Sequence, residues 1–118
     1  MRFACQKIPA QEVYCFTDWR MWLYTFDVIE DGGFRVRSML VWNKGSGGMG
    51  AKWRSQHELI CWGARGSVGT SWGTGNVLTF SRSGNAHHPT EKPVPLVAEL
   101  VRAADRPLVV DPFMGSGT

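Results

Sequence analysis

A short apolar run leads into an acidic residue and a glycine turn in the stretch Leu108-Val109-Val110-Asp111-Pro112-Phe113-Met114-Gly115-Ser116-Gly117-Thr118. A continuously apolar run of this length is typical of a parallel strand that is covered on both faces of its sheet. The glycines allow backbone angles that other residues avoid, so the main chain can approach a ligand closely. The stretch therefore predicts an α/β protein with a nucleotide-type pocket at the carboxyl end of this strand.

The glycine turn departs from two common nucleotide-binding motifs. It lacks the third glycine of the dinucleotide fingerprint, and it lacks the lysine of a phosphate-binding P-loop. NAD and ATP are therefore not the first choice of ligand. The turn suits adenosine or the amino-acid part of a cofactor at least as well.

A helix is expected immediately before this strand. One apolar stripe with helical spacing runs over residues 91–105 and comprises Leu96, Val97, Leu100, Val101 and Ala104. Pro93 and Pro95 lie in or before the first turn, where a missing N–H costs nothing. Arg106-Pro107 then ends the helix.

Residues 12–18 predict another strand, because β-branched and aromatic residues form a short apolar run there. Asp18 has two interpretations, which are compatible: the N-cap of the next helix, or a pocket residue at the carboxyl end of the strand. The helix is expected over residues 19–30. Its apolar stripe would be Trp19, Trp22, Leu23, Phe26 and Ile29.

Two further strands, residues 34–44 and 58–64, are expected to pair antiparallel at one edge of the sheet, because no helix lies between them. The long loop between them is rich in glycine and carries Lys44, Lys52 and Arg54. Such a loop, which also holds a tryptophan, suits a DNA backbone and an extruded base. A solvated hairpin loop without a partner is the alternative, and the length of the loop favours the functional interpretation.

The composition is that of one domain that buries a core. The chain has 118 residues, 43% of them hydrophobic, and a formal charge of +3, which mildly favours a polyanionic partner. Three cysteines without a CxxC pair fit a reducing cytoplasm. His57, Cys61 and the His87-His88 pair match no common zinc spacing, so no metal is expected. The chain has no apolar run of 18 residues and no signal-peptide pattern, so we expect a soluble cytoplasmic protein with no membrane partner.

The chain resembles the beta group of DNA amino-methyltransferases in two motifs, His88-Pro89-Thr90-Glu91-Lys92-Pro93 and, after one helix and one strand, the stretch from Asp111 to Thr118. These enzymes methylate adenine N6 or cytosine N4 with S-adenosylmethionine. The resemblance extends, more weakly, to Thr17-Asp18-Trp19-Arg20, Trp42-Asn43-Lys44 and Arg54-Ser55-Gln56-His57-Glu58. It implies an α/β, partial Rossmann-like methyltransferase fold: a mostly parallel sheet with an antiparallel edge pair, truncated at both ends.

The resemblance implies a role for each residue of these motifs. The loop that wraps the methionine part of the cofactor would comprise Asp111, Phe113, Gly115, Ser116, Gly117 and Thr118. Thr90, Lys92 and Pro93 would pack against the same end of the cofactor. Main-chain N–H groups after Gly115 and the Thr90 hydroxyl could hold the cofactor carboxylate, assisted by the Lys92 charge, and Asp111 could accept from the cofactor ammonium. Without the resemblance, Thr90 is expected to be a helix N-cap and Lys92 a surface charge.

One motif of the family is absent from the chain. In the family, an Asp or Asn followed by Pro-Pro and an aromatic residue accepts hydrogen bonds from the target amine and stacks on the flipped base. The six prolines of this chain are all isolated, and Pro112 belongs to the cofactor loop. The motif is expected before the strand at Val13, so no catalytic residue is assigned and these 118 residues alone are expected to be inactive.

Three functions are therefore carried forward: part of a DNA amino-methyltransferase, a non-catalytic DNA-binding remnant that uses Lys44, Lys52 and Arg54, and an unrelated Rossmann-type nucleotide binder. For the methyltransferase, double-stranded DNA is the expected partner, with a restriction enzyme as a further one. Residues 1–118 would form part of one methyltransferase domain. Within it, residues 65–86 are a candidate for a short target-recognition insert and residues 87–118 form the cofactor-binding segment.

Overall fold

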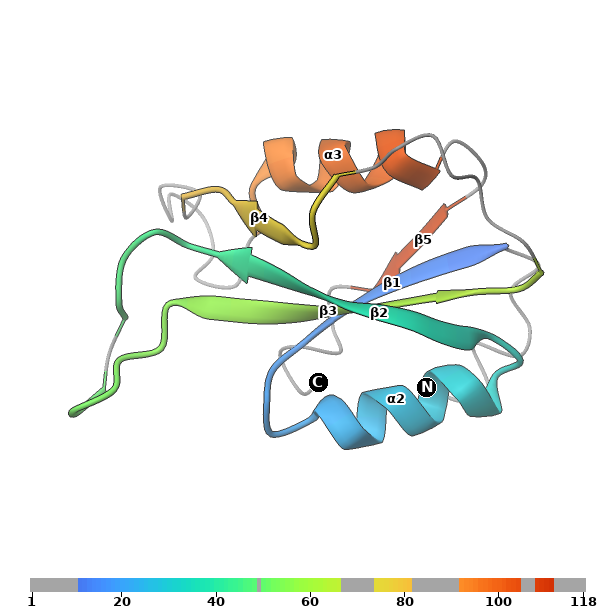
Figure 1. Ribbon diagram of the computed structural model, residues 1–118, viewed down its shortest axis with the longest axis horizontal. Helices are drawn as coiled ribbons and strands as arrows, with labels where there is room; N and C mark the ends of the chain where they lie inside the picture. Colours follow the sequence, from blue (N-terminus) through green and yellow to red (C-terminus); the bar gives the residue numbers. More distant parts are fainter. Residues whose placement is uncertain (1–10, 49, 67–73, 82–91, 105–107, 112–118) are drawn as a thin grey trace.

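The computed structural model describes residues 11–48, 50–66, 74–81, 92–104 and 108–111, and for 108–111 the main chain only. In this part of the chain a sheet lies between two helices (Figure 1). The strands are β1 (Glu12–Thr17), β2 (Arg35–Asn43), β3 (His57–Ala64), β4 (Val77–Thr79) and β5 (Leu108–Asp111), and the helices are α2 (Trp22–Asp31) and α3 (Val94–Ala104). None of the described helices is long and apolar enough to cross a membrane.

The strands follow the order β4-β2-β3-β1-β5 across the sheet. β3 runs antiparallel to both β1 and β2, whereas β5 is parallel to β1 and β4 is parallel to β2. Four strands therefore run in one direction and end at the same side of the sheet. We call this side, where Thr17, Asn43, Thr79 and Asp111 lie, the carboxyl edge.

The α/β fold predicted from the sequence is confirmed, and so are the antiparallel pairing of β2 with β3 and the short apolar strand before Asp111. The antiparallel pair does not lie at an edge of the described sheet, because β4 adds on beyond β2. There, the Val41 N–H donates to the Asn76 carbonyl (2.8 Å) and the Trp42 indole N–H to the Phe80 carbonyl (2.7 Å). Part of the candidate recognition insert, residues 77–79, is thus a strand of the sheet.

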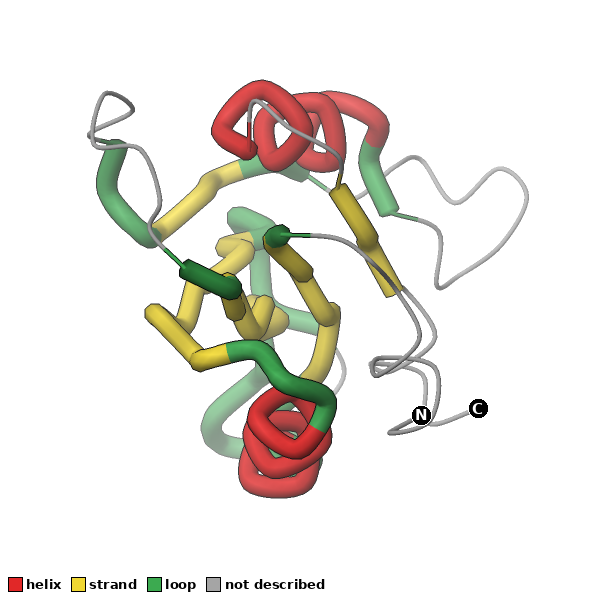
Figure 2. The backbone as a smooth tube through the Cα atoms, turned by 90° about the vertical axis from the view of Figure 1, so that its right-hand side faces the viewer, coloured by secondary structure: helices red, strands yellow, loops and turns green. Residues whose placement is uncertain are grey.

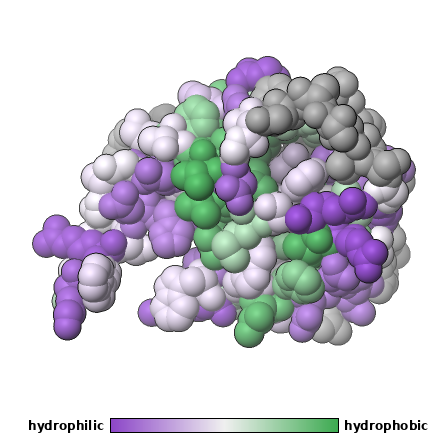
Figure 3. All heavy atoms as spheres, in the orientation of Figure 1, coloured by the Kyte–Doolittle hydropathy of each residue, from purple (hydrophilic) through white to green (hydrophobic). Residues whose placement is uncertain are grey.

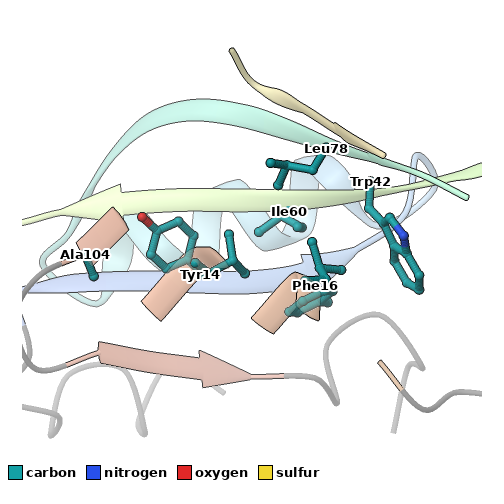
Figure 4. Packing of buried hydrophobic residues seen from close by; sticks show 8 residues of the cluster. Tyr14, Phe16, Trp42, Ile60, Leu78 and Ala104 are labelled. Atoms are coloured by element: carbon teal, nitrogen blue, oxygen red, sulfur yellow. The ribbon is translucent and has the colours of Figure 1, made fainter. Parts of the chain in front are cut away.

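Each face of the sheet packs against one helix (Figure 2). On the α2 side the buried cluster comprises Val13, Cys15, Val28, Ile29, Phe34 and Cys61. On the α3 side, shown in Figure 4, it comprises Tyr14, Phe16, Trp42, Ile60, Leu78, Leu96, Leu100 and Ala104. All six residues of β1 are buried because both faces of this strand are covered.

The two helices differ in how well their apolar stripes predict burial. In α3, Leu96, Leu100 and Ala104 are buried as predicted, although Val101 is exposed. In α2 the predicted stripe is right for Ile29, which is buried, and Trp22 packs partly buried against the same cluster. Leu23 and Phe26 are exposed, and Thr25 and Val28 are buried in their place.

A buried hydroxyl pair explains the orientation of α2. The Thr25 hydroxyl hydrogen-bonds the Thr17 hydroxyl of β1 at 2.9 Å, and a buried hydroxyl needs such a partner. Thr25 thus faces the sheet on the same side as Val28 and Ile29, whereas Leu23 is 78% exposed and Phe26 lies at the surface. Apolar side chains accordingly appear on the surface over α2, and others over β2 (Figure 3).

Candidate functional site

Asp18 follows the last residue of β1 and closes the turn into α2. Its Oδ1 accepts hydrogen bonds from the N–H groups of Arg20 and Met21, both at 3.0 Å. These bonds satisfy main-chain donors ahead of the helix, as a capping residue does. The same residue lines a cavity, so the expected pocket position agrees with the structure. The expected N-cap position is wrong, because the N-cap of α2 is Met21 and Asp18 lies in the turn before it.

This cavity of about 230 Å³ lies at the carboxyl edge. Three segments meet around it: the turn after β1, the end of β2 and the start of β3. Its lining is mixed in charge and comprises Asp18, Trp19, Arg20, Lys44, Ser55, His57, Glu58 and Leu59. In open α/β sheets, ligands bind beyond the carboxyl ends of the strands, so this edge is the candidate site.

The three basic residues predicted to bind DNA lie in two different environments. The Lys44 ammonium pairs with the Glu58 carboxylate at 2.8 Å and lies 4.9 Å from the centre of the Trp42 ring. Lys52 and Arg54 are exposed on the loop between β2 and β3. The described part of this loop, to which Lys52 and Arg54 belong, extends away from the body of the molecule (Figure 3).

Main-chain hydrogen bonds shape this loop. The Lys44 N–H donates to the Gln56 carbonyl and the Gly48 N–H to the Ser55 carbonyl, both at 2.8 Å. Lys52 has a φ of 70°, in the left-handed region. Next to it, the Trp53 side chain is 87% exposed. The loop thus presents an aromatic ring between two cations, an arrangement that suits stacking on a base beside a phosphate backbone.

Lys92 is one of the two described residues of the motif from His88 to Pro93. Its ammonium lies 2.9 Å from Glu58 Oε1 and 5.1 Å from the centre of the Phe16 ring, and its side chain is only 10% exposed. The expectation of a surface charge, made without the resemblance, is therefore wrong. Its neighbour Pro93 is buried, and the Pro93 carbonyl accepts from the N–H groups of Leu96 and Val97 at the start of α3.

Sequence reasoning did not single out Glu58, which bonds both Lys44 and Lys92. Burial would raise the pKa of this carboxyl, but hydrogen bonds from Lys44 and Lys92 outweigh burial, and the pKa is lowered. A signal was available in the sequence. Glu58 alternates with Ile60 and Trp62 along one strand, so it faces the same side of the sheet as core residues. A carboxylate in that position needs a cationic partner.

The cofactor loop begins at the end of β5. Asp111 is opposite Cys15 in the parallel register, so β5 ends at the carboxyl edge beside β1. Thr90, Phe113, Gly115, Ser116, Gly117 and Thr118 lie outside the described residues. Their role in cofactor binding stays a prediction, as do the roles of Lys92, Pro93 and Asp111.

His57 and Cys61, weighed above as metal ligands, have different surroundings. His57 is exposed at the start of β3, whereas Cys61 is fully buried. Burial, with a smaller contribution from Glu30, raises the pKa of the Cys61 thiol to about 12. Among the described residues, no three His, Cys, Asp or Glu side chains come together as a metal site.

Comparisons with known proteins find similarity to methylases. The family model for DNA methylases of the N6/N4 type matches residues 66–118. A protein named as a methylase, YubD of Escherichia coli (strain K12), is 49% identical over 45 residues, which are 36% of this chain and 20% of that protein. The crystal structure of the M1.HpyAVI-SAM complex superposes with a TM-score of 0.67 at 24% identity. That match covers 93% of this chain and 61% of the other, so the two share a fold and this chain spans only part of either relative.

Proposed function

We propose that the chain forms the cofactor-binding part of a DNA methyltransferase, because its residues 66–118 match the family model for DNA methylases of the N6/N4 type. The proposed reaction transfers a methyl group to the exocyclic amine of adenine (N6) or cytosine (N4) in double-stranded DNA. S-adenosylmethionine supplies that methyl group, which the positive charge on sulfur makes reactive. The observation that carries the proposal is the parallel pairing of β5 with β1, because it brings the start of the predicted cofactor loop to the carboxyl edge.

The residues of this chain would act by binding and orienting. The main chain after Gly115 and the side chains of Thr90 and Asp111 would hold the amino-acid end of the cofactor. Lys52 and Arg54 would contact the DNA backbone. Positioning of the two reactants and exclusion of water are the contributions that such a transfer requires from the protein.

We propose that these 118 residues alone transfer no methyl group, because they contain no Pro-Pro pair and hence no catalytic motif of the family's type. The same observation favours a second candidate function, a non-catalytic DNA-binding protein. A methyl-transfer assay with tritiated cofactor and unmethylated double-stranded DNA would separate the two halves of the proposal. Turnover by this chain would contradict the inactivity and leave the assignment of the cofactor standing.

Calorimetry tests the cofactor assignment on the full chain. We expect binding of S-adenosylmethionine and no comparable binding of NAD. Gly115→Val should weaken the binding of S-adenosylmethionine by about tenfold or more, because a branched side chain keeps the main chain away from the ligand. Gly75→Val is the matched control, since a side-chain carbon at Gly75 meets no atom within 4 Å. Binding of NAD but not of S-adenosylmethionine would contradict the proposal.

A further inference from the structure

Glu58 uses both oxygens of its carboxylate on lysines from two other segments. Oε1 lies 2.9 Å from Lys92 Nζ, and Oε2 lies 2.8 Å from Lys44 Nζ. The three residues come from the start of β3, the residues in front of α3 and the end of β2. We call them the Lys44–Glu58–Lys92 cluster. It joins the segment that the family motif assigns to the cofactor with the strand end that leads into the basic loop.

The surroundings of Lys92 hold its ammonium inside this cluster. The side chain is 10% exposed, and Nζ lies 5.1 Å from the centre of the Phe16 ring and 5.6 Å from that of Trp42. Aromatic faces attract a cation at such distances. Separating a largely buried ammonium from its carboxylate would leave both charges poorly solvated. A ligand that recruited Lys92 directly would have to compete with these interactions.

The cluster also fixes the beginning of α3. Lys92 directly precedes Pro93, whose carbonyl accepts hydrogen bonds from the N–H groups of Leu96 (3.1 Å) and Val97 (3.2 Å). These are the bonds that open the helix. An ion pair at Lys92 therefore anchors the first turn of α3 to β3, which is 34 residues away in the sequence.

We propose that Glu58 is a positioning residue of the cofactor site, and that Lys92 is the group through which it acts rather than a ligand of the cofactor. The carboxylate fixes Lys92, and with it Pro93, in front of α3 at the carboxyl edge. Pro93 is one of the residues that the family motif assigns to the cofactor site. The inference rests on the proposed function. It gives Lys92 a different role from the one that the motif alone implies.

A double-mutant cycle on the full chain tests this role. The dissociation constant of S-adenosylmethionine is measured by calorimetry for the native chain, Glu58→Gln, Lys92→Met and the double variant. We expect each single change to weaken binding by about tenfold, as loss of a residue behind a ligand typically does, and the double variant to be no weaker than either single. Circular dichroism confirms that the variants are folded. If Lys92 is a ligand, Glu58→Gln leaves binding unchanged or tighter, and Lys92→Met weakens it equally in both backgrounds; that result overturns the proposal.

Hydrogen exchange gives a second measurement that needs no cofactor. In Glu58→Gln the amides of Leu96 and Val97 should exchange about tenfold faster, because the first turn of α3 loses its anchor. Glu99→Gln is the matched control: it removes a carboxylate on α3 that pairs with the exposed Arg102, and these amides should exchange as before. Unchanged exchange in Glu58→Gln overturns the proposal. Absence of cofactor binding by the native chain would instead contradict the proposed function, and exchange would still decide the role of Glu58.

Discussion

Gly63 shows how a single position limits the packing of α2 on the sheet. It lies on β3, and a side-chain carbon built there would be 2.7 Å from Ile29 Cγ2 and 3.2 Å from Phe34 Cβ. The first distance is too short for two carbon atoms. The absence of a side chain at Gly63 thus lets Ile29 of α2 pack directly onto the main chain of the sheet.

We predict that Gly63→Ala destabilises the protein by about 1–3 kcal/mol, the range typical of overpacking in a filled core. The free energy of unfolding in urea measures the change. Gly75→Ala, which adds the same group where no atom lies within 4 Å, should change stability by less than about 0.5 kcal/mol. Equal losses in the two variants would show that Ile29 and Phe34 do not restrict this position.

At the scale of elements, the loop between β2 and β3 is exposed as its sequence suggests, whereas helix α2 is more exposed than its apolar residues suggest. The loop displays Lys52, Trp53 and Arg54 at its surface. Helix α2 displays Leu23 and Phe26 because Thr25 determines which side faces the sheet. For the loop, exposure agrees with a role in DNA binding, which requires side chains that are free to reach phosphates.

We predict that the pair of changes Lys52→Ala and Arg54→Ala weakens binding of double-stranded DNA and makes it less sensitive to salt. Loss of two phosphate contacts should reduce the slope of log K against log salt by about 1.8. Fluorescence anisotropy over a series of salt concentrations measures this slope. The matched control is Arg35→Ala with Arg102→Ala, two exposed arginines at the start of β2 and the last turn of α3, away from the carboxyl edge. An equal effect of the control pair would mean that DNA responds only to net charge.

At the scale of the whole molecule, the sheet direction gathers the site. Because β1, β2, β4 and β5 end at one edge, the turn after β1, the basic loop and the start of the predicted cofactor loop all leave the sheet there. The Lys44–Glu58–Lys92 cluster ties β2, β3 and the start of α3 together at this edge. The ion pairs of this cluster therefore contribute to the stability of the fold as well as to the shape of the site.

We predict that the ion pairs of Glu58 make the free energy of unfolding decrease at acidic pH. The pKa of Glu58 is lowered in the folded protein from 4.5, so the unfolded chain takes up the proton first as the pH falls. The contribution of Glu58 is thus complete well above pH 4.5 and is lost as the pH falls below that value through the folded pKa. Urea unfolding at a series of pH values should show a smaller loss of stability in Glu58→Gln than in the native chain. Glu99→Gln should lose stability as the native chain does, since an exposed pair on one helix contributes little.

Much of this architecture follows from local patterns. The short apolar run within β1, the stripe of α3 and the apolar stretch before Asp111 each predict the element that forms, because burial on one or both faces imposes a recognisable pattern. The stripe of α2 is right at Ile29 and wrong at Leu23 and Phe26. It counts only apolar residues, whereas the buried side of the helix also carries Thr25, whose hydroxyl bonds that of Thr17. Strand β4 has three residues, too few for a period to identify.

The sequence by itself determined the α/β fold class and the order of the elements apart from β4. Both depend on short motifs and on spacing along the chain, which need no knowledge of distant contacts. Only the tertiary structure decided what the charged residues do. The sequence alone indicates no partner for Lys44 or Lys92. The fold brings both to Glu58, which lies 34 residues from Lys92 along the chain. The hydrophobic pattern of a sequence predicts which side chains are buried. The partner of a buried charge depends instead on how the strands and helices pack.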